Sequence, residues 1–171
     1  MTYDDLRKNI ATWVKNVLAI EVIYASGQGP RPKDQYVTIN VTPSEKLIED
    51  VRTETREVGG EIRADYEGVR KIMVSINVYR GEPMQAMITL RNSLSKILTQ
   101  DYFNSLDIGI IEPNAINRIP EQIGKSWEDR SQCDFFFHYI PDIDSDPDIS
   151  EIKQIEITNE INGEMINVSD I

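Results

Sequence analysis

The sequence is poor in the side chains that most often carry catalysis, with one cysteine and one histidine in 171 residues. A single cysteine, Cys133, excludes a disulfide within the chain and is typical of a reducing compartment. Cys133 and His138 fall on opposite faces of the same expected strand, so they do not form a Cys–His nucleophilic pair. We expect Cys133 to be a buried, inert thiol and His138 to be structural. No Ser/His/Asp set or metal-ligand cluster stands out. We therefore expect no enzyme activity, catalytic residue, metal or cofactor.

Long apolar runs are also missing. No stretch approaches the roughly 20 residues that a helix needs to cross a bilayer. The first residues, MTYDDLRKNIATW, are polar and acidic, unlike the start of a signal peptide. We therefore expect no membrane association.

Positive charge is scarce, with a net charge of −11. Residues 141–171 hold nine acidic residues and one basic residue, a net charge of −8, whereas residues 1–140 hold 20 acidic and 17 basic residues, a net charge of −3. Tight binding of nucleic acid needs clustered lysine and arginine. We expect no sequence-specific nucleic-acid binding, although DNA would slide past such a surface without sticking.

Two motifs look like ligand sites but do not match the pattern that such a site requires. In GQGPRP, residues 27–32, two prolines remove backbone donors and a strand follows, whereas a P-loop leads into a helix. We interpret this stretch as a stiff loop that presents Arg31. In the acidic run from Asp142, an EF-hand would need glycine and glutamate where Pro147 and Lys153 stand.

Hydrophobic periodicity predicts two helices and several strands. The first helix covers residues 3–18, capped by Thr2, and the second begins at Pro83. Its expected buried stripe is Met87, Leu90, Leu94, Ile97 and Leu98. Alternation predicts strands at 21–25, 36–42, 72–79 and 130–139, with two short strands within 106–120.

Residues 44–68 contain a Gly59-Gly60 turn signal. A two-residue turn would set Arg56 opposite Arg63, which is unfavourable. We expect a shifted hairpin or a mobile loop.

An Asn162-Gly163 pair predicts a hairpin near the C-terminus. Pairing outward from that turn sets Ile161 opposite Glu164, Asn159 opposite Ile166, and Ile157 opposite Val168. One face then gathers apolar residues: Ile155, Ile157, Ile161, Ile166 and Val168. Since an isolated hairpin is marginal in water, this face must dock on the chain's own body or on a neighbour.

The segment SWEDRSQCDFFFHY allows two interpretations. In the first, Trp127 packs at the edge of the core and Arg130 is exposed. In the second, Glu128, Asp129 and Arg130 belong to a subunit contact.

Several segments taken in order resemble the neck or tail-terminator proteins of tailed bacteriophages. They are VIYASGQGPRPKDQYVTINVT, a charged hairpin region, KIMVSINVYRG, a helix with LRNSL, and SWEDRSQCDFFFHY. The resemblance covers roughly residues 10–140, and its specificity comes from the order of these short motifs. It includes Arg31, Pro32, Trp127, Glu128 and Arg130, which with Ile157, Ile161, Ile166 and Val168 are our candidates for an oligomer or tail interface.

The resemblance implies an α+β fold. We expect a mixed, mainly antiparallel sheet flanked by two helices over residues 1–140, then an acidic linker and C-terminal β-hairpin extension over residues 141–171. It also implies a non-enzymatic homo-hexameric ring in the virion neck, assembled in the bacterial cytoplasm. Such a ring stops polymerisation of the tail tube and meets the tail tube protein and the head completion or connector protein, with the tail sheath as a further candidate partner. The alternative is a small intracellular ligand-binding or accessory domain, monomeric or dimeric.

Overall fold

The computed structural model describes residues 1–27, 30–42, 45–47, 51–58, 61–124, 126–141, 155–158 and 165–168. The chain divides into two compact units. One comprises Met1–Asp50 and Glu67–Asp142, and the other comprises Val51–Tyr66 and Ile143–Ile171. The fold is α+β, as expected.

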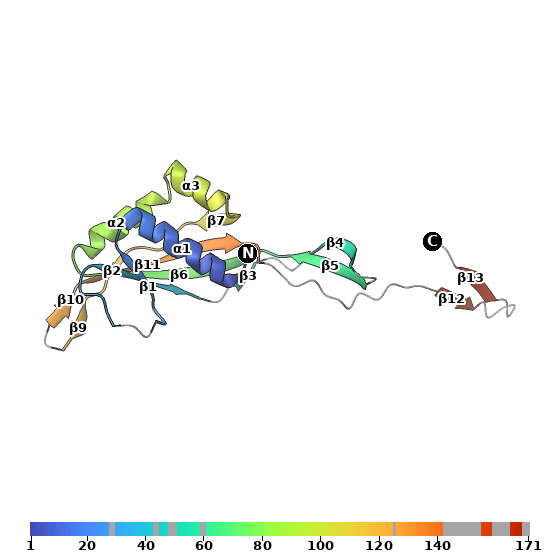
Figure 1. Ribbon diagram of the computed structural model, residues 1–171, viewed down its shortest axis with the longest axis horizontal. Coiled ribbons are helices and arrows are strands. Elements are labelled where there is room, and N and C mark those ends of the chain that lie inside the picture. The colour runs from blue at the N-terminus through green and yellow to red at the C-terminus, as the bar shows by residue number, and fades with distance from the viewer. Residues whose placement is uncertain are drawn as a thin grey trace. The chain divides into compact units, whose positions relative to one another are not determined.

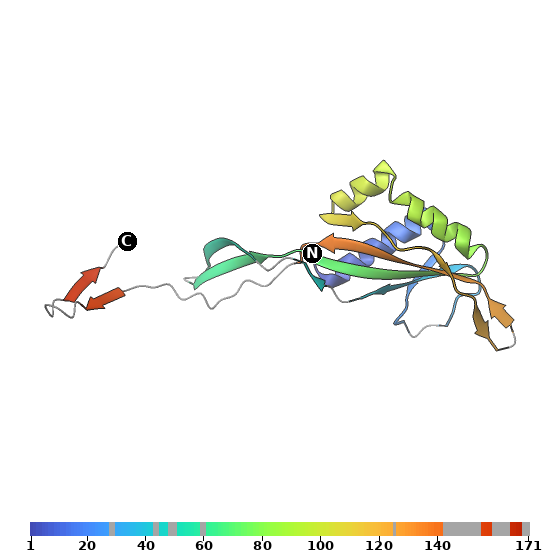
Figure 2. The ribbon, with the colours of Figure 1, turned by 180° about the vertical axis from the view of Figure 1, so that it is seen from behind.

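The larger unit has three helices on one face of a sheet (Figures 1 and 2). The helices are α1 (Tyr3–Leu18), α2 (Pro83–Ser93) and α3 (Ile97–Asn104). The sheet contains β1 (Glu21–Tyr24), β2 (Tyr36–Val41), β3 (Glu45–Lys46), β6 (Arg70–Tyr79), β7 (Ile108–Ile111), β8 (Asn117–Arg118) and β11 (Arg130–Tyr139). Its order is β1-β2-β6-β11-β7, with β3 paired to β6 and β8 to β11. The β1–β2 pair is parallel and the others are antiparallel, so the sheet is mixed and mainly antiparallel, as predicted.

Three further pairs of strands form small hairpins. They are β9 (Glu121–Ile123) with β10 (Ser126–Glu128), β4 (Val51–Val58) with β5 (Glu61–Glu67), and β12 (Ile155–Thr158) with β13 (Met165–Val168). The pairing of β4 with β5 agrees with a hairpin at Gly59-Gly60, two residues that lie outside the described part of the chain.

The C-terminal hairpin is present, but its predicted register is wrong. Ile157 pairs with Ile166, not with Val168, and Ile155 pairs with Val168. The partner of Ile157 therefore moves by two positions, and because strands repeat every two residues, the same residues still share a face. The apolar pattern is the same in both registers and cannot distinguish them. The Asn162-Gly163 turn signal predicts the register that is not observed. Ile161 lies outside the described residues.

Helix α1 follows its sequence signals closely. The Asp5 amide donates to the Thr2 hydroxyl at 3.2 Å, which caps the helix as predicted. Leu6, Ile10, Trp13 and Val14 are buried against the sheet. The helix ends where Ala19 takes a left-handed conformation, with φ of 53°.

The second predicted helix is two helices. Ser93 is fully buried, accepts from Trp13 Nε1 at 3.1 Å and donates to the Leu90 carbonyl at 2.6 Å. The Leu94 amide then bonds to the Arg91 carbonyl and Lys96 is extended, so α2 ends at Ser93. Because residues 94–96 are not helical, the residues after them do not continue the helical spacing on which the predicted stripe depends. Ile97 and Leu98 are 74% and 84% exposed instead of buried.

The core lies between the helices and the sheet and centres on Trp13. Its ring makes edge contacts with Phe103 of α3 and with Phe135 and Phe137 of β11, at centroid distances of 5.4, 5.5 and 6.0 Å. With its hydrogen bond to Ser93, Trp13 joins α1 to both other helices and to a central strand.

Replacing Trp13 by alanine should lower the free energy of unfolding by about 3–5 kcal/mol, since it opens a large cavity. Trp127→Ala is the matched control, because Trp127 is 69% exposed and its loss should cost less than about 0.5 kcal/mol. Urea denaturation followed by far-UV circular dichroism measures both. Equal effects of the two variants would contradict the central role of Trp13.

Cys133 is fully buried on β11, and burial raises its pKa to about 11. Because the thiolate is the reactive form, iodoacetamide at pH 8 should alkylate the folded protein far more slowly than the protein in guanidinium chloride. Mass spectrometry over time gives both rates. Similar rates would mean that Cys133 is accessible in the folded chain.

Candidate functional site

A cluster of charged side chains surrounds Glu128 at the end of β10. The Glu128 side chain is only 7% exposed, and both of its carboxylate oxygens are occupied. Arg80 Nε donates to Oε1 at 2.5 Å, and Arg31 Nη1 donates to Oε2 at 3.2 Å. A carboxylate this buried is stable only with such partners.

Glu121 is the second carboxylate of the cluster. The β9–β10 register places it directly opposite Glu128, an arrangement of like charges that is unfavourable by itself. Arg31 relieves it by reaching both carboxylates, with Nη2 lying 3.6 Å from Glu121. Arg130 Nη1 lies 3.9 Å from Glu121. We call Arg31, Arg80, Glu121, Glu128 and Arg130 the Glu128 cluster.

Arg80 ties three segments of the chain together. It follows β6 in a left-handed conformation, with φ of 65°, and its amide donates to the Asp129 carbonyl at 3.0 Å. Its Nη1 donates to the carbonyls of Pro32 and Lys33, the latter at 2.7 Å. Side-chain and backbone bonds together hold this uncommon conformation, in which a non-glycine residue is strained.

Aromatic rings support the cluster from the sheet. Tyr36 and Tyr79 pair across β2 and β6 and stack with centroids 4.7 Å apart. The Arg80 guanidinium lies 5.7 Å from the Tyr36 centroid, and that of Arg130 lies 5.3 Å from Tyr79. Burial raises the pKa of Tyr36, and the charge of Glu128 raises it further. Partial burial alone would lower the pKa of Arg31, but Tyr36, Glu121 and Glu128 raise it above its ordinary value.

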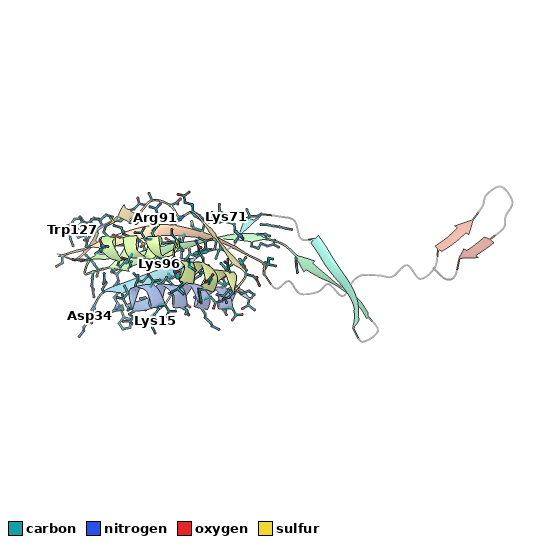
Figure 3. The ribbon with its side chains drawn as sticks, turned by 90° about the horizontal axis from the view of Figure 1, so that it is seen from above. Lys15, Asp34, Lys71, Arg91, Lys96 and Trp127 are labelled. Carbon is teal, nitrogen blue, oxygen red and sulfur yellow. The ribbon has the colours of Figure 1, made fainter. Side chains whose placement is uncertain are left out.

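Trp127 stands beside the cluster and is 69% exposed. It lines a hollow together with Arg80, Gly81, Ser126, Glu128 and Asp129. Asp129 is held by Arg118, whose Nε and Nη2 donate to the two carboxylate oxygens at 2.9 and 3.0 Å. These bonds lower the pKa of Asp129. Figure 3 places Trp127 at the end of the unit, well apart from Arg91 and Lys96.

The fold brings together sequence candidates that lie 97 positions apart. Arg31 bonds directly to Glu128, and Arg80 joins the Pro32 carbonyl to the same carboxylate. Trp127 does not pack into the core, so the first interpretation of its motif is wrong on that point. Arg130 is only partly exposed, since its Nε and Nη2 both donate to Asn77 Oδ1.

Sequence reasoning missed Arg80 and Glu121. Nothing in the sequence around Arg80 indicates Glu128, 48 positions away, as its partner. The remaining candidates, Ile157, Ile166 and Val168, belong to β12 and β13 in the other unit.

Chemically, the Glu128 cluster is a set of mutually paired charges that fixes backbone segments. Within the described ranges, no group of three or more histidine, cysteine, aspartate or glutamate residues is arranged to hold a metal ion. Nor does any helix there have the length and apolar character needed to cross a membrane. The geometry suits a rigid surface that presents Trp127.

The family model for phage neck terminator proteins matches residues 4–164. The chain belongs to this family. No curated protein matches the sequence. The match extends beyond the predicted resemblance at both ends and includes most of the C-terminal segment. The family is structural, and membership implies a component of the virion with a tail-terminator role.

Replacing Glu128 by glutamine should lower the free energy of unfolding by about 1–3 kcal/mol, because it leaves Arg31 and Arg80 without their shared charge. The matched control is Glu21→Gln on β1, an exposed glutamate that forms no ion pair with the described residues, and it should change stability by less than about 0.5 kcal/mol. Urea titrations compare the two. A Glu128→Gln variant as stable as the control would show that the cluster does not hold the loop.

Proposed function

We propose that this neck terminator protein forms a ring of six identical subunits at the head-proximal end of the phage tail. The ring caps the tail tube, stops its polymerisation and joins the tail to the head connector, while DNA passes through its lumen. The observation that carries this proposal is family membership over residues 4–164. The partners are further copies of the chain, the tail tube protein and the head completion or connector protein, with the tail sheath as a further candidate.

The charge distribution supports passage of DNA. A body with a net charge of −3 and a whole chain with a net charge of −11 give phosphates little to bind. The arginines of the Glu128 cluster are engaged by carboxylates, so they are not a free basic patch. DNA would therefore move past the protein without being retained.

The Glu128 cluster supports a role in contacts with other proteins. Tryptophan is the residue type most enriched at the energetic centres of interfaces. Trp127 is exposed on a short hairpin that Arg31 and Arg80 hold in place, so little order is lost when it is buried by a partner. We assign Arg31, Pro32, Trp127, Glu128 and Arg130 to a subunit or tail contact. In this proposal residues 1–140 form the body of the terminator and residues 141–171 its extension.

A phage that lacks this protein should make tails of irregular, increased length that do not join heads. Electron microscopy of lysates measures tail length and the fraction of joined particles, with the protein supplied from a plasmid as the control. Tails of normal length in its absence would contradict the proposal and favour an accessory role.

A further inference from the structure

The corner between α2 and α3, residues 94–98, carries an unusual amount of exposed apolar surface. Leu98 and Ile97 are the most exposed large apolar side chains of the described chain, at 84% and 74%. Single exposed apolar residues are ordinary. These two are adjacent, and Leu98 also lines a groove.

That groove lies between α1 and α3. Its apolar wall is formed by Trp13 and Val17 of α1 and by Leu98 and Tyr102 of α3. Lys96 is the one charged residue lining it. The groove thus offers an apolar floor with a positive charge at its rim, which suits a ligand that is apolar on one face and acidic elsewhere.

The helical layer has positive charge without a partner. Lys15, Arg91 and Lys96 form no ion pair within the described ranges, whereas Asp4 and Asp5 pair with Arg7 and Lys8. Asp101 is the one acidic residue on the helices that forms no ion pair with the described residues. In Figure 3, Lys15, Arg91 and Lys96 all lie along the helices. This surface would attract a negatively charged partner.

The chain itself contains such a partner. Residues 141–171 have a net charge of −8. Their two strands pair Ile157 with Ile166 and Ile155 with Val168, which places four apolar positions on one face of the hairpin. A two-stranded hairpin of this size is marginal alone and gains stability by covering that face.

The length of the connection allows docking on another subunit. Thirteen residues separate Pro141 from Ile155. An extended chain of that length spans about 45 Å, more than the diameter of a small domain. The hairpin therefore has the reach to leave its own body.

We propose that the β12–β13 hairpin of one subunit docks in the α1–α3 groove of a second copy, with Ile157 and Ile166 covering Leu98. The proposal rests on the self-association put forward above and names one of its contacts. The acidic segment would be drawn to Lys96 and its neighbours before the apolar face is buried.

Site-directed crosslinking tests the contact in the full-length protein. Leu98→Cys and Ile157→Cys are made in separate proteins, which are mixed and treated with a short bismaleimide. Native Cys133 should not react with the bismaleimide, because it is fully buried. We expect a crosslinked pair that contains one chain of each variant, identified by mass spectrometry of the joined peptides.

Asn40→Cys, mixed with Ile157→Cys, is the matched control. Asn40 is exposed on β2, and its neighbours Ile39 and Val41 are buried on the helical side, so Asn40 lies on the opposite face of the sheet. It should give no product. Equal yields from Asn40→Cys and Leu98→Cys would overturn the groove as the docking site.

Charge supplies a second test. Lys96→Glu should slow crosslinking between Leu98→Cys and Ile157→Cys several-fold, because it opposes the acidic segment. Lys33→Glu makes the same change of charge on the loop before β2 and should leave the rate unchanged. Equal slowing by both would mean that net charge alone acts.

Mass photometry of the same mixtures separates the two proposals. If rings form but no Leu98–Ile157 crosslink appears, the proposed docking site is wrong and the proposed ring is retained. In a double variant with both Leu98→Cys and Ile157→Cys, a crosslink formed only within one chain would overturn docking on a second copy. Monomers alone, at concentrations where tails assemble, would overturn both proposals.

Discussion

The buried carboxylate of Glu128 is the constraint on which one end of the larger unit depends. It must be compensated where it lies, because a lone buried charge costs several kcal/mol. Two arginines from distant parts of the chain supply that compensation, and each then fixes something else. Arg31 relieves the repulsion between the facing Glu121 and Glu128. Arg80 adopts a left-handed backbone conformation, and its side chain donates hydrogen bonds to the carbonyls of Pro32 and Lys33. The rigidity of the hairpin that carries Trp127 follows from these bonds.

The helical layer depends on a buried aromatic ring instead of a buried charge. Trp13 is buried with its indole N–H bonded to Ser93, and that bond sits where α2 ends. The break restarts the helix in a new phase and leaves Ile97 and Leu98 exposed beside the groove that Trp13 helps to line. Trp13 thus belongs both to the aromatic core and to the wall of the apolar groove. Exposed apolar surface of this kind is retained where a partner covers it.

Local patterns predicted the elements whose causes are local. The alternation in β6 and β11, the Thr2 cap and the bounds of α1 each depend on neighbours in sequence, and all three are confirmed. The break at Ser93 was missed because the hydrogen bond that accompanies it comes from Trp13, 80 positions away. The Glu128 cluster was predicted only in part, because its members also come from distant parts of the sequence. Sequence motifs indicated Arg31 and the Trp127–Arg130 segment separately, but only the register of β2, β6 and β11 brings Arg80 and Glu128 together.

The positions of these surfaces bear on how copies of the chain would assemble. Trp127 lies at one end of the body, and the α1–α3 groove lies on the helical layer. In the proposed docking, the groove of one copy meets the β12–β13 hairpin of another, so that contact joins unlike surfaces. Unlike surfaces generate a ring when the rotation between copies closes and a filament when it does not. A tail tube lengthens by repeating its contacts, whereas the proposed terminator ring requires a rotation that closes. In the proposed ring, a contact fixed by the Glu128 cluster would set that rotation, and the docked hairpin would add a second contact between the same copies.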